Sequence, residues 1–199
     1  VWNEPLPKIE LRYRNLTKAY FRVVPFDWEK RKKIGQNQPE YIDHRRKAEW
    51  LGRQPVKEWS VDLPPTDDFK QRVEKITAPK GLEPGSYFLF ASHDPKFGDK
   101  ENRVSYSSFW VSDLSLVMRT RQGSGAIEGF VLNAISGEPI QGATIRPWKR
   151  ERNNRGVELR GTRTDANGLF KLQTNRTGLT ILASHQGQSL ATANDYYVN

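Results

Sequence analysis

Histidine is the side chain best suited to acid–base or metal chemistry near neutral pH, and this chain holds three of them, His44, His93 and His185. They lie far apart in the sequence, and none stands at metal-ligand spacing from another. His93 precedes Asp94, but a polar pair at the end of a strand explains this dipeptide. Cysteine is absent, which removes disulfides, thiolate ligands and thiol nucleophiles. We therefore predict no metal site, no cofactor and no catalytic residue.

Two glycine-containing stretches look like functional loops but lack the context that such loops need. Residues 187–191, Gly-Gln-Ser-Leu-Ala, are one letter short of the GxSxG nucleophile elbow, and no strand-to-helix turn surrounds them. Gly123, Gly125 and Gly129 have the wrong spacing for a dinucleotide loop, and a strand pattern follows where a helix N-terminus is needed. A hydrolase with a hidden triad is therefore the least favoured class.

Basic residues gather in one predicted hairpin, where they could bind a polyanion or a partner protein. The formal net charge is +9, and the candidate surface comprises Arg146, Lys149, Arg150, Arg152 and Arg155. Trp148 is the best local candidate for stacking on a nucleic-acid base. Glu151 and Glu158 interrupt the cluster, and no nucleic-acid module signature accompanies it. A solvated hairpin tip is therefore favoured over a nucleic-acid surface.

Most of the chain alternates apolar and polar residues with period two, and aromatic and β-branched residues are frequent in these stretches. The pattern predicts strands at residues 18–24, 56–63, 69–76, 86–92, 104–111, 114–119, 127–132, 143–148, 157–163, 169–172 and 179–184. Turn residues separate the strands at short intervals, as in β-sandwiches. The predicted turn glycines are Gly85, Gly137, Gly142 and Gly168. The predicted fold class is all-β, with two tandem β-sandwich domains.

The first domain is expected to carry a helical insertion near residues 27–53, where the strand rhythm stops. A short helix ending near Gly52 is predicted there, because four residues fall at helical spacing: Tyr41, His44, Ala48 and Leu51. The flexible residues 120–125 predict a linker, so the expected domains span residues 1–120 and 126–199.

The ends of the chain suggest a longer parent protein. Val1 is not an initiator Met, so we expect that the chain is processed or cut from something longer. The sequence stops at Asn199 without an evident terminating element, so we expect that the second domain is incomplete or that the parent continues. No apolar run approaches 18 residues, so no membrane insertion by this segment is expected.

The second domain carries a turn pattern with a family resemblance. Residues 136–145 read Ser-Gly-Glu-Pro-Ile-Gln-Gly-Ala-Thr-Ile, and residues 164–170 read Thr-Asp-Ala-Asn-Gly-Leu-Phe. Proline fixes one turn, and Asn-Gly favours a tight hairpin in the other. This pattern resembles the prealbumin-like β-sandwich of carboxypeptidase-regulatory-like domains. The resemblance implies a fold and says little about activity.

Strings in the first domain and at the junction extend the resemblance to nearly the whole chain. Residues 82–89 read L-x-P-G-x-Y-x-L, residues 111–114 read Val-Ser-Asp-Leu, and residues 129–139 open the second domain with G-x-V-L-N and a Ser-Gly-x-Pro turn. In this order they resemble the N-terminal macroglobulin-like domains of bacterial α2-macroglobulin-family proteins.

That family resemblance implies an exported parent, periplasmic or at the cell surface and in some cases membrane-anchored, that traps proteases after a bait segment is cut. Many members use a Cys-Gly-Glu-Gln thioester, which a chain without cysteine cannot hold, and no bait-like stretch is evident. The segment would then be a non-enzymatic scaffold. Its partners would be other domains of the parent, with a target protease or a surface protein beyond them.

A rival hypothesis is a carbohydrate- or surface-binding tandem of β-sandwiches in an outer-surface assembly, with Trp28, Trp50 and Trp148 as an exposed platform. Other aromatic residues are predicted to pack in strands and core: Trp59, Tyr87, Phe88, Phe90, Phe109 and Trp110. The rest of the parent sequence would discriminate the two hypotheses, through bait and thioester segments or a lectin or catalytic module.

Overall fold

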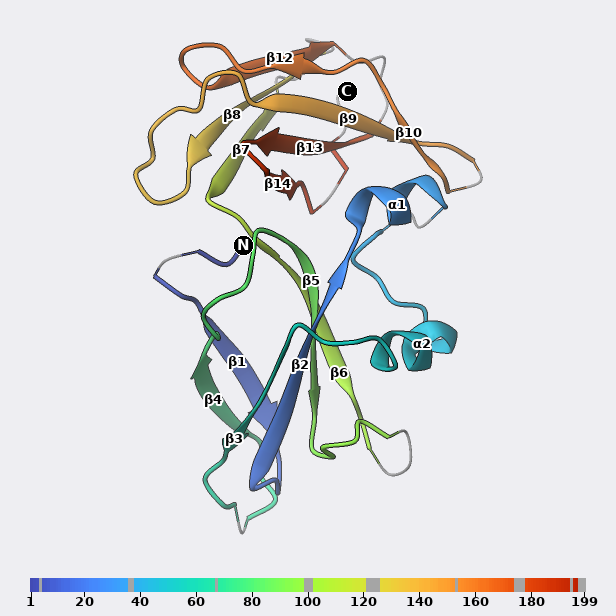
Figure 1. Cartoon of the computed structure of the whole chain (residues 1–199), viewed down its shortest axis with the longest axis vertical. Coiled ribbons are helices and arrows are strands. Elements are labelled where there is room, and N and C mark those ends of the chain that lie inside the picture. The colour runs from blue at the N-terminus through green and yellow to red at the C-terminus, as the bar shows by residue number, and fades with distance from the viewer. Residues whose placement is uncertain are drawn as a thin grey trace. The chain divides into compact units, whose positions relative to one another are not determined.

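The computed structural model (Figure 1) describes residues 1–3, 5–35, 38–66, 68–98, 102–120, 126–152, 154–173, 178–193 and 195–196. The chain forms two compact units. Unit 1 contains residues 1–26 and 40–111, and unit 2 contains residues 27–39 and 112–199. The all-β prediction is confirmed, because strands make up most of the regular structure in both units.

The units divide the chain differently from the predicted domains. Strand β7 (Leu114–Thr120) pairs with β8 (Ala126–Asn133), so it belongs to unit 2 rather than to a first domain ending at residue 120. Residues 27–39 also belong to unit 2, although they were expected within an insertion of the first domain. Residues 121–125 of the predicted linker lie outside the described residues.

Unit 1 is built on a four-stranded antiparallel sheet in the order β3-β2-β5-β6. These strands are β2 (Lys18–Phe26), β3 (Lys57–Asp62), β5 (Gly85–Ser92) and β6 (Ser105–Val111). A separate ribbon pairs β1 (Lys8–Tyr13) with β4 (Arg72–Thr77). The ribbon packs against one face of the sheet, where Phe21, Val23 and Phe109 are buried in a shared core.

The other face of this sheet carries Phe88 and Phe90 and is covered by two short helical segments. These are η1 (His44–Arg46) and α2 (Lys47–Leu51), which fall in the region predicted as helical. Trp50 of α2 is buried with its ring 4.9 Å from that of Phe88. The Ile42 N–H donates to the Tyr106 hydroxyl at 2.9 Å, which fixes the chain entering η1.

Unit 2 contains two sheets that form the layers of a sandwich (Figure 1). One has the order β12-β8-β7, with β12 at Leu169–Gln173. The other has the order β10-β9-β13-β14, with β9 (Thr144–Arg150), β10 (Gly156–Glu158), β13 (Leu179–His185) and β14 (Gln188–Ala191). A short strand, β11 (Thr162–Arg163), also pairs with β9. The strand predicted at 157–163 is therefore two strands, and β14 was not predicted.

Helix α1 (Trp28–Lys33) belongs to unit 2, and the sequence did not predict it as a helix. Asp27 is its N-cap, with the side chain accepting from the Lys30 N–H at 2.9 Å. Gly156 of β10 lies directly against α1, because a Cβ added there would come within 2.5 Å of Lys32 Cγ.

The predicted turn glycines have different backbone conformations. Gly137, Gly142 and Gly168 have φ of 75°, 75° and 70°, in the left-handed region that favours glycine. Gly85 instead opens β5 without a positive φ. At Gly168 a Cβ would also lie 2.6 Å from the Val131 carbonyl oxygen, so two independent reasons require glycine there.

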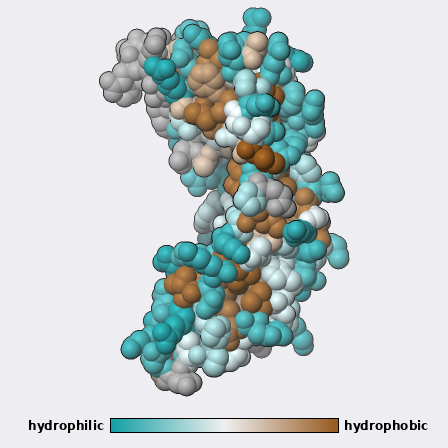
Figure 2. Space-filling model, turned by 90° about the vertical axis from the view of Figure 1, so that its left-hand side faces the viewer, coloured by the Kyte–Doolittle hydropathy of each residue, from teal (hydrophilic) through white to brown (hydrophobic). Residues whose placement is uncertain are grey.

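Apolar side chains form several groups within a largely hydrophilic surface on the face drawn in Figure 2. Among the described residues, no helix has the length and apolar character needed to cross a membrane.

Candidate functional site

The predicted basic surface lies at the hairpin between β9 and β10. Its backbone is closed by pairing of Arg150 with Gly156 and by a 2.9 Å hydrogen bond from the Glu151 N–H to the Arg155 carbonyl. Arg150, Arg152 and Arg155 are exposed, and Lys149 is half-buried. Strand pairing therefore places Lys149, Arg150, Arg152 and Arg155 at or beside one hairpin tip.

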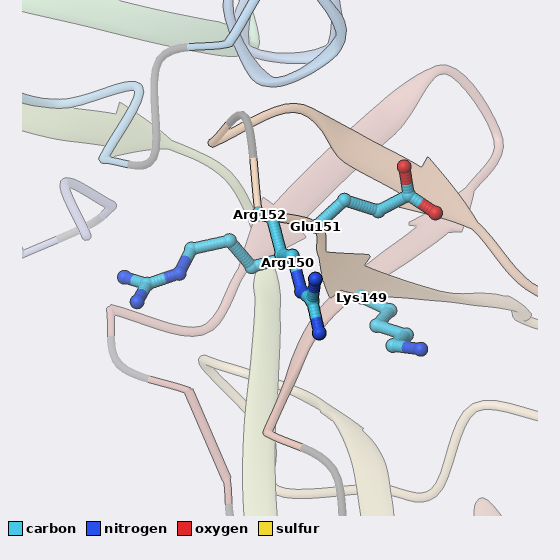
Figure 3. A pocket seen from close by; sticks show the side chains of 4 residues that line it. All are labelled: Lys149, Arg150, Glu151 and Arg152. Carbon is cyan, nitrogen blue, oxygen red and sulfur yellow. The ribbon is translucent and has the colours of Figure 1, made fainter.

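An open hollow of about 430 Å³ at this tip is lined by Lys149, Arg150, Glu151 and Arg152 (Figure 3). The charged ends of the four side chains spread apart in Figure 3 rather than converging on one point. Three cations against one carboxylate give the tip a net positive charge. Such a surface attracts anions diffusely, and salt screens the attraction.

Arg146 has a different role from the other predicted basic residues. Its guanidinium donates to Glu29 Oε2 at 2.8 Å, makes a second hydrogen bond to Glu29 Oε1, and lies 3.8 Å from Glu158. Hydrogen bonding to Glu29 raises the pKa of Arg146 above its ordinary value. Arg146 therefore holds α1 on the sheet and is not part of the exposed tip.

The three tryptophans of the rival hypothesis are buried, so the predicted exposed platform is wrong. Trp28 and Trp50 are each 2% exposed and Trp148 is 1% exposed. The Trp28 and Trp148 rings meet edge-on at 6.0 Å, and Lys33 Nζ lies 5.6 Å from the Trp148 ring. Arg53 lies 3.6 Å from the Trp50 ring. The rings pack against the protein itself, because each short helix needs a large apolar anchor to stay on its sheet.

Sequence reasoning also missed a buried cation in α1. Lys32 is 2% exposed, and its Nζ donates to Thr180 Oγ1 of β13 at 2.8 Å. The Thr180 hydroxyl in turn donates to Asp195. A signal for the helix was present in Asp27 as an N-cap residue and in the Glu29–Lys33 pair at i,i+4 spacing.

The residues considered for chemistry are not gathered into one site. His44 begins η1, His93 follows β5, and His185 ends β13. No group of three or more possible metal ligands occurs within the described parts of the chain. Gly129 is explained by packing, because a Cβ there would come within 2.6 Å of the Phe170 ring. Ser189 lies in a hairpin and hydrogen-bonds Ser184 at 2.9 Å, which is not an elbow geometry.

Comparison with known proteins identifies the class of fold. A scan of protein-family models and a search of curated proteins both find no match. Two crystal structures of native alpha-2-macroglobulin from Escherichia coli match most of the chain. The one spanning domains MG0-NIE-MG1 has a TM-score of 0.70 and 15% identity, covering 94% of this chain and 58% of that one. The one spanning NIE-MG1 has a TM-score of 0.69 and 14% identity, covering 93% and 87%.

The chain therefore has the fold of macroglobulin-like domains, as the sequence strings predicted. The native conformation of E. coli alpha-2-macroglobulin, determined by cryo-EM, also matches, with a TM-score of 0.51 and 17% identity. The match covers 93% of this chain and 11% of that one. The present chain thus spans a small part of the larger protein to which it is similar.

Proposed function

We propose that this chain is a non-catalytic structural segment of a larger, exported α2-macroglobulin-like protein whose role is to trap proteases. The observation that carries the proposal is the continuous structural likeness over both units, which covers 93% of this chain and 87% of the two-domain NIE-MG1 structure. A likeness that runs through two successive units supports a shared domain order as well as a shared fold.

The geometry supports a scaffold role for the aromatic and basic residues. The tryptophans are packing anchors, and Arg146 and Lys32 hold α1 on its sheet. In this proposal the segment positions other domains of the parent, and the exposed residues of the β9–β10 tip contact an acidic partner surface.

The proposal is tested by comparing this chain with the complete gene product in a protease assay. A protease enclosed by a large protein loses access to protein substrates by size exclusion, whereas small peptide substrates still reach it. We expect the complete product to block cleavage of a protein substrate and spare cleavage of a small peptide. Residues 1–199 alone should inhibit neither reaction, because scaffold domains cannot enclose a protease.

Three results would contradict the proposal. The first is a gene product that contains no further domains. The second is inhibition of peptide cleavage by residues 1–199 alone, which would indicate direct blockage of an active site. The third is turnover of a peptide, ester or glycoside by the isolated chain.

A further inference from the structure

A row of hydrogen-bonding side chains crosses four strands of the β9-containing sheet. Register pairs Arg163 of β11 with Thr144 of β9, Thr144 with Ser184 of β13, and Ser184 with Ser189 of β14. Residues in direct register project from the same face of a sheet. Thr144 also shares its face with Arg146 and Trp148, two and four residues along β9, so the row lies on the face that α1 covers farther along the strands.

This row lines a pocket of about 410 Å³ in unit 2. The volume falls within the range of about 300–1,000 Å³ that is typical of small-molecule sites. Among the described residues that line it, which include His185 and Gln188, there are hydroxyl, guanidinium, imidazole and amide groups and no carboxylate. The side chain of Gln188 is already engaged, because its Nε2 donates to Asp113 at 2.9 Å.

The backbone holds both ends of the row in place before any ligand arrives. Next to Arg163, buried Thr164 accepts from the Ala143 N–H at 2.8 Å and donates to the Ile140 carbonyl at 2.6 Å. At the other end, a two-residue turn with positive φ at Gln186 and Gly187 closes the β13–β14 hairpin. Such fixed positions reduce the entropy lost on binding.

The hydrogen-bonding capacity of the row favours an acceptor-rich ligand. In the 2.9 Å contact between Ser184 and Ser189, one hydroxyl donates to the other, so the second hydroxyl hydrogen remains for an external acceptor. Arg163 is exposed, and within the described part of the chain no carboxylate pairs with its guanidinium. A guanidinium beside hydroxyl donors matches the oxygens of a carboxylate or phosphate.

We infer that the Arg163–Thr144–Ser184–Ser189 row is a binding site for a compact oxyanion. Arg163 supplies the charge, and the hydroxyls of the neighbouring strands supply directed hydrogen bonds. The oxyanion is either a free phosphate or a carboxylate carried by an acidic segment of a protein. This site is distinct from the β9–β10 tip, whose charged groups diverge. It does not depend on the proposed scaffold function.

The site is tested by NMR titration of the ¹⁵N-labelled whole chain with inorganic phosphate and, separately, with a capped Glu-rich peptide. About 150 mM NaCl is kept constant, because salt at that level screens diffuse attraction beyond about 8 Å. We expect saturable shifts of the amides of Thr144, Arg163, Ser184 and Ser189. Saturation by phosphate alone identifies a phosphate site, and saturation by the peptide identifies an acidic protein segment.

Arg163 of β11 and Arg160, three residues before it in the chain, provide a matched pair of variants. Arg163→Gln should weaken binding about tenfold or more, because charge-assisted hydrogen bonds are roughly twice as strong as neutral ones. Arg160→Gln removes the same charge from an exposed residue outside the pocket lining and should leave binding unchanged. Ser189→Ala should weaken binding less than Arg163→Gln while preserving the dispersed spectrum. Absence of saturable shifts with both probes, or equal binding by Arg163→Gln and Arg160→Gln, would overturn the inference.

Discussion

Helices α1 and α2 perform the same task in different units, and they are stabilised differently. Each is less than two turns long and places one buried tryptophan edge-on against an aromatic ring of a sheet. Around α2, the anchor is mainly aromatic and the nearby ion pairs of Glu49 are exposed. Around α1, Glu29 and Lys32 make half-buried and buried polar contacts with β9 and β13.

The difference follows from where each helix lies in the sequence. Helix α2 lies in the same continuous stretch of chain as strands of its sheet, whereas α1 is separated from β9 by more than one hundred residues and lies between two segments of the other unit. An apolar anchor alone fits many sheet faces, but a carboxylate and a buried ammonium need matching partners. The polar contacts thus give α1 specificity for one face.

Truncation of Trp28 and of Trp50 should produce the largest losses of stability. Each loss should be confined to the unit that contains the tryptophan. Trp28→Ala and Trp50→Ala should each cost about 3–5 kcal/mol, because each removes a buried indole and leaves a cavity. Hydrogen exchange should show weakened protection in β9 and β13 for Trp28→Ala, and in β2 and β5 for Trp50→Ala. Loss of protection confined to β2 and β5 in Trp28→Ala would contradict the assignment of residues 27–39 to unit 2.

The hairpin at Gly168 in unit 2 should tolerate a side chain far less well than the loop at Gly98 in unit 1. Gly168→Val should cost about 3 kcal/mol, because φ is 70° and the Cβ would lie 2.6 Å from the Val131 oxygen. Gly98→Val should cost below about 1 kcal/mol, because the residue has no positive φ and, among the described residues, an added Cβ would meet the flexible Asp94 carboxylate at 3.2 Å. Urea denaturation measures both, and equal costs would show that the hairpin turn is misplaced.

Double-mutant cycles should show that the ion pair of α1 is stronger than those of α2. Glu29→Gln with Arg146→Gln should give a coupling of about 1–2 kcal/mol, because both side chains are two-thirds or more covered. Glu49→Gln with Arg53→Gln should give a much smaller coupling, because both side chains are more than 40% exposed and solvent screens the pair. Equal couplings in the two cycles would remove the proposed distinction between the helices.

Lowering the pH should produce the smallest change in stability, and the change should arise in unit 1, which contains Asp94. Hydrogen bonds from the Lys96 and Gly98 N–H groups lower the pKa of Asp94. The unfolded chain therefore binds more protons at this residue, so stability is present above the ordinary pKa and is lost as pH falls below about 4. Thermal melts of Asp94→Asn should show a smaller loss between pH 6 and pH 3 than the unaltered chain. An identical pH dependence would exclude Asp94 as a contributor.

The sequence predicted those strands and turns that are specified by neighbouring residues alone. Period-two alternation located most strands, since each buries one face whatever its partner. The Asn-Gly turn at residues 167–168 likewise needed no distant information. Strand β14 was missed because it is only four residues long and overlaps the stretch considered as an elbow. Helix α1 was missed because six residues give too little periodicity.

The candidate sites were harder to predict, because side-chain exposure depends on distant partners. Arg146 appeared to belong to a solvated cluster, but Glu29, more than one hundred residues earlier, binds it. The three tryptophans fit a platform by sequence alone, but α1 and α2 pack on their sheets and bury all three rings. The Arg163–Ser189 row required strand register across four strands, which sequence patterns do not supply.

The early position of α1 in the chain sets an order of events during synthesis. About 150 residues separate Lys33 from β13, so at about 5–20 residues per second a ribosome needs roughly 7–30 seconds to complete that strand. A six-residue helix does not persist alone in water for such a time. Trp28 and Lys32 therefore emerge long before Trp148 and Thr180 exist to receive them. We expect α1 to be the last element of unit 2 to form, and its exposed tryptophan to be a natural target for chaperones on the nascent chain.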